Sequence, residues 1–151
     1  MTHKSTPLAS PVRMMALMMI IALLIQFLLG MYTNLFIALP RVTTQGSGAL
    51  MPGMGRMMSV GLSDPVFMVH MIVGMLLALG AIATVIVAVR AKQTPFLIIT
   101  VIGLISVLIA GYGGLTFFMH GQHNSASYTM AIGWLSALTT YFMATLREGA
   151  G

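Results

Sequence analysis

The residue in this sequence that is best suited to take part in chemistry is His70, the only ionisable side chain in the apolar run 66–89. An ionisable group at membrane depth is costly and by default indicates a functional site. Imidazole is also a common ligand of haem iron and transition metals. Gly74, one helical turn further along, would leave a gap beside the ring for the edge of a flat cofactor. We therefore predict that His70 binds haem iron at a site that includes Gly74. The alternative is that His70 bonds a neighbouring side chain or carbonyl.

A second axial ligand would have to lie at the depth of His70. Met130 meets this requirement, because it follows Asn124 by six residues and would lie about 9 Å inside a helix that starts there. Thioether and imidazole form a haem-ligand pair with a raised reduction potential. His120 and His123 are the alternatives, although both lie in or beside a loop and could simply be solvated.

Gln26 is, with Asn34, the strongest polar group in the first apolar run, residues 14–39. Polar side chains within a membrane span usually hold helices together. Gln26 could equally bond haem propionates or a quinone headgroup, and we include it among the expected cofactor-binding residues.

A methionine cluster in the loop 42–63 indicates a different chemistry. Thioethers are soft ligands for Cu(I), and spaced methionines can collect it. The residues concerned are Met51, Met54, Met57 and Met58. The alternative is chance enrichment, since the chain has sixteen methionines and this side chain is a common flexible filler.

The composition requires lipid as the solvent. The chain has 151 residues, 58% hydrophobic and only 6% charged, whereas soluble domains are about 25% charged. Four apolar runs are each long enough to cross the bilayer as a helix, the conformation that satisfies the backbone there. They lie at residues 14–39, 66–89, 95–119 and 127–146. We predict an all-α, single-domain membrane protein over residues 1–151, an antiparallel four-helix bundle whose first run is retained as an anchor.

Two of the expected helix starts have clear signals. Asp64-Pro65 and Thr94-Pro95 each place a capping residue before a proline suited to the first helical position. Asn124 or Ser125 is the expected cap of the fourth helix.

The basic residues predict the orientation in the membrane. In a four-span chain the two terminal segments and the loop between the second and third runs lie on the same side of the membrane. Five basic residues lie in these segments: Lys4, Arg13, Arg90, Lys92 and Arg147. Only Arg41 and Arg56 lie on the other side. Because basic residues accumulate on the cytoplasmic side, we expect both termini in the cytoplasm and the protein in the cell membrane. The net charge of +5 thus indicates topology rather than nucleic-acid binding.

Several chemistries lack the residues that they need. No Asp, Glu, Lys or Arg lies inside any of the four runs, which disfavours a proton pump or ion-coupled transporter. The chain has no cysteine, and therefore no thiolate ligand or iron–sulfur cluster. No nucleophile–base pair, phosphate-binding glycine loop or zinc-protease motif is present, so no catalytic residue is assigned.

Short motifs in all four runs carry a family resemblance. The first run contains Gln26-Phe27-Leu28-Leu29-Gly30 and the second Val69-His70-Met71-Ile72-Val73-Gly74, followed by Arg90 and Lys92. The third contains the segment 104–114, and the fourth Met130-Ala131-Ile132-Gly133. This pattern resembles one four-helix half of the haem A synthase family, and also small, mostly uncharacterised four-span bacterial membrane proteins.

The resemblance implies a haem site near the outer face. In the family, paired histidines on the second and fourth helices of a half bind haem. His70 matches the first position, and the second falls at or beside Met130. The family's catalytic region also has a glutamate near a histidine of helix two, which this chain lacks. The resemblance therefore implies the bundle and one haem b rather than the oxidation chemistry.

We accordingly expect a small membrane b-type haem protein that acts in electron transfer or in redox or gas sensing. A cofactor-free accessory subunit of a larger respiratory membrane complex is the alternative, and Cu(I) binding by the methionine loop is a third. Expected partners are the bilayer and a membrane complex, or further copies of the chain.

Overall fold

The computed structural model describes residues 11–37, 59, 63–92, 94–120 and 122–147. Within these residues it is helical, without strands. The long helices are α1 (Pro11–Phe36), α3 (Pro65–Arg90), α4 (Thr94–His120) and α5 (Asn124–Arg147). All four are long and apolar enough to cross a membrane, which confirms the predicted number of spans. α1 begins before the predicted residue 14, because Pro11 is suited to the first turn of a helix.

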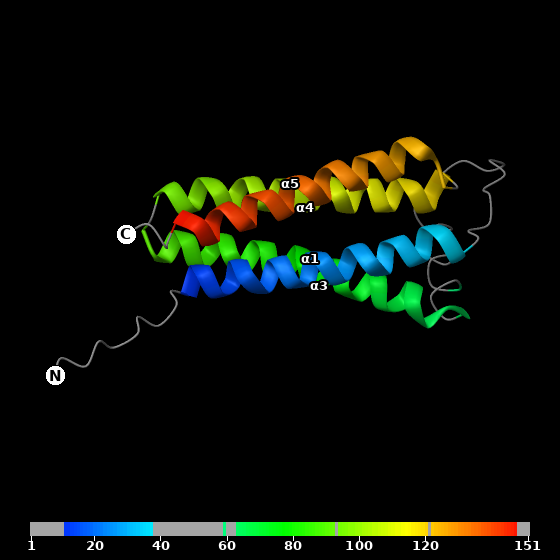
Figure 1. Cartoon of the computed structure of the whole chain (residues 1–151), viewed down its shortest axis with the longest axis horizontal. Helices are drawn as coiled ribbons and strands as arrows, with labels where there is room; N and C mark the ends of the chain where they lie inside the picture. Colours follow the sequence, from blue (N-terminus) through cyan, green and yellow to red (C-terminus); the bar gives the residue numbers. More distant parts are fainter. Residues whose placement is uncertain (1–10, 38–58, 60–62, 93, 121, 148–151) are drawn as a thin grey trace.

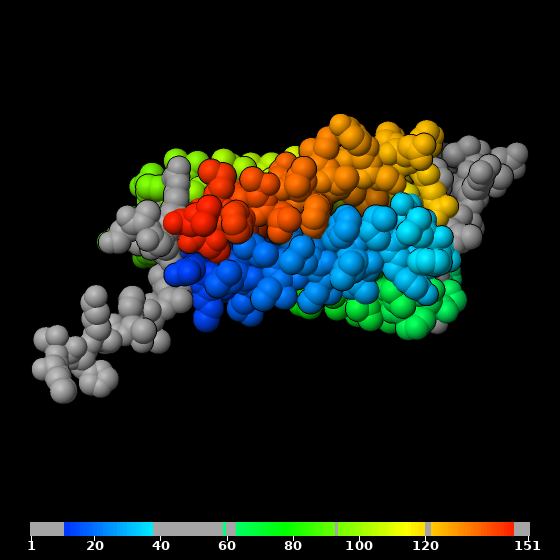
Figure 2. Space-filling model, in the orientation of Figure 1, coloured from blue at the N-terminus to red at the C-terminus, as the bar shows by residue number. Residues whose placement is uncertain are grey.

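The helices form a bundle in which each packs against two others (Figure 1). The main interfaces are α1 with α3, α3 with α4, α4 with α5, and α5 with α1. Successive helices run in opposite directions, and α1 begins at the end of the bundle where α5 finishes. Figure 2 shows α1 and α5 side by side along one face of the molecule.

The capping at the helix starts follows partly from the sequence. Asp64 is the N-cap of α3, as predicted: its side chain accepts hydrogen bonds from the N–H groups of Val66 at 2.9 Å and Phe67 at 3.1 Å. In α5 the carbonyl of His123 accepts the first bonds, from Ala126 and Ser127. The capping position is therefore His123, one residue before Asn124 and two before Ser125, the two predicted caps.

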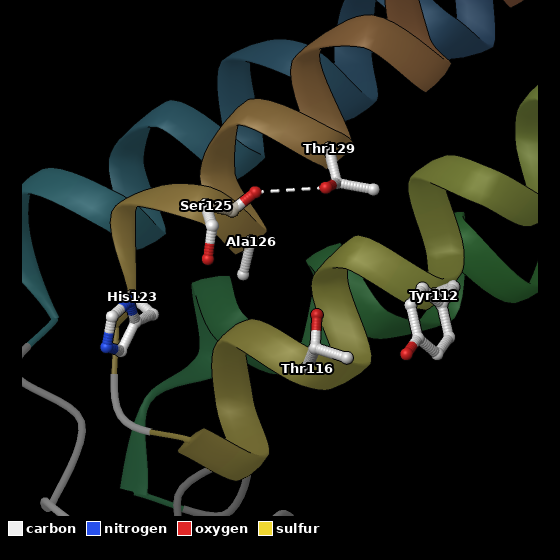
Figure 3. A pocket seen from close by; sticks show the side chains of 6 residues that line it. All are labelled: Tyr112, Thr116, His123, Ser125, Ala126 and Thr129. Carbon is white, nitrogen blue, oxygen red and sulfur yellow. Dashed lines mark hydrogen bonds between the residues drawn. The ribbon is translucent and has the colours of Figure 1, made fainter.

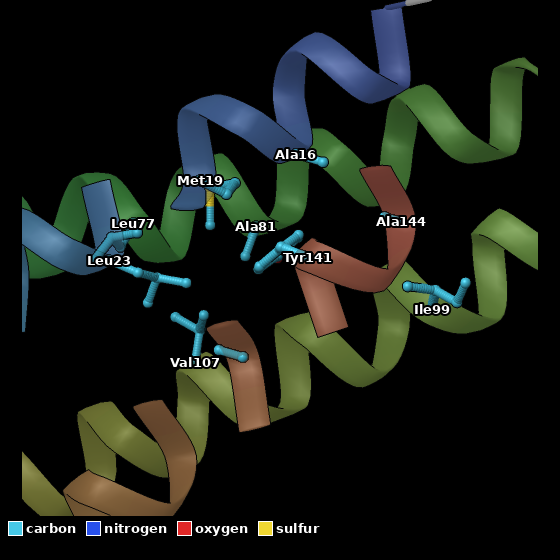
Figure 4. Close-up of a cluster of buried hydrophobic side chains, with 10 residues drawn as sticks. Ala16, Met19, Leu23, Leu77, Ala81, Ile99, Val107, Tyr141 and Ala144 are labelled. Carbon is cyan, nitrogen blue, oxygen red and sulfur yellow. The ribbon is translucent and has the colours of Figure 1, made fainter. Parts of the chain in front are cut away.

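The interior is divided into two clusters. The first lies where α1 begins and α5 ends, and includes the fully buried Tyr141, Ala81 and Ala144 beside Leu23 (Figure 4). The second, at the opposite end, contains Ile37, Phe67, Phe117, Phe118 and Ala126. We call these the inner and outer clusters, where the inner end of the bundle denotes only the end at which α1 begins and α5 finishes, and the outer end the opposite one. Outside them, large apolar side chains cover all four helices, as suits helices with lipid around them.

The two helical hairpins pack at different spacings. In α4 and α5 the backbones meet: a Cβ added at Gly133 would lie 2.5 Å from the nitrogen of Ala110, and one added at Gly113 would lie 2.7 Å from that of Met130. In α1 and α3 the glycines meet side chains of the opposite helix instead: His70 at Gly30, Gln26 at Gly74 and Met19 at Gly80. Small residues allow the close approach of α4 and α5. The α1–α3 interface instead accommodates the two polar side chains Gln26 and His70.

Candidate functional site

The predicted site residues Gln26 and His70 are in contact. The amide nitrogen of Gln26 lies 3.5 Å from Nε2 of the His70 ring, at the distance limit of a hydrogen bond. Both side chains are half-buried between α1 and α3. The sequence placed each residue in its span, and the structure brings the two together.

Each of these polar side chains covers a glycine of the opposite helix. A Cβ added at Gly30 would lie 3.1 Å from Cε1 of His70, and one added at Gly74 would lie 3.0 Å from the amide nitrogen of Gln26. The pattern is reciprocal because Gln26 precedes Gly30 by four residues, His70 precedes Gly74 by four, and the helices are antiparallel. The open gap expected at Gly74 is therefore filled by Gln26, and a flat cofactor does not rest on that glycine in this arrangement.

Two polar atoms of the pair remain without a partner. His70 Nδ1 and Gln26 Oε1 are buried, and neither has a hydrogen-bond partner among the residues that the structure describes. Buried polar atoms are nearly always bonded, so each such atom requires an explanation, such as a ligand or an ion. A donor and an acceptor both remain available here, because an imidazole can carry its proton on either nitrogen.

Met130 is held in the interface between α4 and α5. Its backbone nitrogen and Cγ lie against Gly113, and its sulfur lies 3.5 Å from the position of a Cβ added at Gly114. Met130 and Met71, the neighbour of His70, both pack against the outer cluster, so α3 and α5 bring these residues to a similar height. To serve as a second axial ligand, the Met130 thioether would have to leave its contact with α4.

The remaining candidates lie at the outer end or outside the described residues. His123 precedes α5 and lines a pocket between α4 and α5. His120 is the last residue of α4, and its side chain is not among those described. The copper candidates Met51, Met54, Met57 and Met58 lie outside the described residues. Within the described part of the chain, no three His, Asp or Glu side chains come together as a metal-binding group.

Two polar contacts that the sequence did not predict tie α1 to the second hairpin. The indole nitrogen of Trp134 donates to the carbonyl of Leu23 at 2.8 Å, and its ring stacks on Phe27 with centroids 4.5 Å apart. Gln122 donates from its amide to the carbonyl of Ile37 at 2.8 Å. Leu23 and Phe27 flank Gln26 in the sequence, so Trp134 helps to fix the turn of α1 that presents Gln26.

No family model, curated protein or solved structure matches this chain.

Proposed function

We propose that this protein is a small membrane b-type haem protein in which His70 is the axial ligand. The observation that supports the proposal is the imidazole itself: Nε2 meets the Gln26 amide while Nδ1 is buried without a partner among the described residues. Histidines that ligate metals commonly use one ring nitrogen and bond a neighbouring group with the other. A bound haem would supply one-electron redox chemistry or a position for a diatomic gas.

Gln26 would orient the ring and select its tautomer. If the amide oxygen of Gln26 faces Nε2, it accepts the Nε2–H bond, and the lone pair of Nδ1 is then available to iron. If the amide NH2 faces Nε2 instead, Nε2 accepts and Nδ1 carries the proton. Rotation of the Gln26 amide thus converts Nδ1 of His70 between a metal ligand and a hydrogen-bond donor.

The imidazole nitrogen of His70 is a suitable ligand for haem iron, but the space at Gly74 that was expected to receive the haem ring is filled. Gln26 occupies the space over Gly74, and Met130 is engaged by α4. The proposal therefore depends on His70 as the protein ligand and assigns no contact between a haem and Gly74.

Absorbance spectroscopy of the purified protein tests the proposal. We expect a Soret band in the isolated or haem-reconstituted protein that shifts on reduction, and we expect His70→Ala to abolish or severely weaken it. His123→Ala is the matched control and should retain the band, because His123 lies at the outer end of the bundle rather than between α1 and α3. Absence of a Soret band after reconstitution, or an unchanged spectrum in His70→Ala, would overturn the assignment.

We further propose that the protein lies in the cell membrane with both termini in the cytoplasm. The unequal division of basic residues supports this orientation. Because the chain has no cysteine, single cysteines report the topology cleanly. In intact cells a membrane-impermeant maleimide should label Asn124→Cys and spare Thr94→Cys. The reverse pattern would invert the orientation.

A further inference from the structure

A pocket with a hydroxyl-rich lining opens between the outer ends of α4 and α5 (Figure 3). It has a volume of about 370 Å³ and is lined by Tyr112, Thr116, His123, Ser125, Ala126 and Thr129. His123 lies at one end of the group and Tyr112 at the other. It is an open hollow rather than an enclosed cavity, so a molecule bound here would stay in contact with the surroundings of the bundle.

The lining offers both hydrogen-bond donors and acceptors. Thr129 donates its own proton to the carbonyl of Ser125 at 3.0 Å, so its oxygen keeps lone pairs that can accept. The hydroxyls of Tyr112 and Ser125 donate to none of the described residues and can therefore form hydrogen bonds with a ligand. Such a wall can bind a carbonyl oxygen or a hydroxyl group equally well.

The charge of the lining disfavours a phosphate. No Lys or Arg is among the residues that line the pocket, and these are the side chains that usually recognise phosphate groups. His123 is the only lining residue that could carry a positive charge, and it is exposed. An uncharged ligand therefore fits this lining better than a phospholipid headgroup.

The pocket reaches below the level of the lipid headgroups. α4 has 27 residues and is about 40 Å long, so each end projects about 5 Å beyond a hydrocarbon core of about 30 Å. Tyr112 lies eight residues before the end of α4, which places it about 7 Å inside the core. A ligand that bonds both Tyr112 and Ser125 must carry at least one polar atom into the hydrocarbon region.

We propose that this pocket binds a lipid-soluble quinone or its quinol. A quinone ring carries two carbonyl oxygens on opposite sides, and the quinol carries two hydroxyls there, so both forms match a lining that donates and accepts at separated points. The exposed Tyr112 leaves the pocket open toward lipid, where an isoprenoid tail would lie. Binding here does not require haem at His70 and goes beyond the proposed function.

Photolabelling with an azido-substituted decyl-benzoquinone tests the site without reference to haem. The full-length protein would be placed in phosphatidylcholine nanodiscs, and labelled peptides would be mapped by mass spectrometry. We expect the label on the facing segments of α4 and α5 around Tyr112 and Thr129, and we expect saturation by unlabelled decyl-benzoquinol. Tyr112→Phe with Thr129→Val should weaken competition about tenfold, through loss of two hydrogen bonds.

Tyr128→Phe with Thr139→Val is the matched control, because these residues lie on exposed positions of α5 outside the pocket. It should leave the competition unchanged. Tyr112→Phe alone removes one oxygen from a side chain that is 65% exposed, so the folded protein should persist and show a smaller loss. The proposal would be overturned by label spread evenly over the four helices, or by an equal loss of competition in the control variant. Displacement of the label by phosphatidylglycerol would also overturn it and would indicate a headgroup site.

Discussion

The imidazole of His70 lies directly on the backbone of Gly30, with Cε1 only 3.1 Å from the position of a Cβ added there. Gln26 lies on Gly74 in the same way, at 3.0 Å. Each helix of the first hairpin therefore contributes one polar side chain and one glycine that receives the polar side chain of its partner. This arrangement places two side chains that can both donate and accept hydrogen bonds inside an apolar bundle, each opposite a glycine of the facing helix.

Substitution of Gly30 by alanine should displace the imidazole while costing little stability. The added methyl group meets the end of a side chain that can move by a few tenths of an ångström, and the overpacking cost of about 1 kcal/mol is offset by a helix-propensity gain of similar size. We expect an unchanged unfolding midpoint in SDS titrations and a shifted or weakened Soret band. An unchanged band with normal haem content would show that the ring position over Gly30 does not matter for binding.

Gly133→Ala should be far more damaging than Gly30→Ala. Its added methyl group would lie 2.5 Å from the Ala110 nitrogen and 2.8 Å from the Ser106 carbonyl oxygen, and backbone atoms of a packed helix cannot move aside singly. We expect a loss of about 2–3 kcal/mol, which is the upper range of overpacking costs, measured by SDS titration of helicity.

Gly111→Ala is the control for that substitution. Nothing lies within 4 Å of a Cβ added at Gly111, so the variant should be neutral or more stable by about 0.5–1 kcal/mol. Equal effects at positions 111 and 133 would contradict the close contact between α4 and α5.

The sequence predicted the helices well and the contacts between them only in part. Four apolar runs of this length must be helices in lipid, and Asp64 before Pro65 marks a start that the structure confirms. The filling of the Gly74 gap could not be read in the same way. A glycine indicates room on a helix surface, but which neighbour fills that room depends on how the facing helix is rotated.

A signal for this contact was nevertheless present in the sequence. Gln26 and Gly30 share the four-residue spacing of His70 and Gly74, and two antiparallel helices with equal spacing of a polar residue and a glycine can fit reciprocally. Trp134 carried no comparable signal, because its acceptor is a backbone carbonyl on α1 and every residue has one.

The Gln26–His70 pair should show a measurable coupling in a double-mutant cycle. Gln26→Leu and His70→Leu each remove one partner at similar volume, and the double variant removes both. Side-chain hydrogen bonds between membrane helices contribute about 0.6 kcal/mol on average and about 1.7 at most. We expect a coupling within that range in SDS unfolding; additive single effects would show that the 3.5 Å contact is not a hydrogen bond.

Trp134→Phe should weaken the attachment of α5 to α1. The substitution removes the indole N–H that donates to the Leu23 carbonyl at 2.8 Å and keeps an aromatic ring that can stack on Phe27. We expect a loss of about 1 kcal/mol from the hydrogen bond, read from helicity in SDS titration.

Phe27→Leu is the complementary variant: it keeps the hydrogen bond, removes the ring contact and should cost about 0.5–1.5 kcal/mol. Because Leu23 and Phe27 flank Gln26, Trp134→Phe should also reduce the Gln26–His70 coupling, whereas a coupling that survives unchanged would mean that α1 holds Gln26 in place without support from α5.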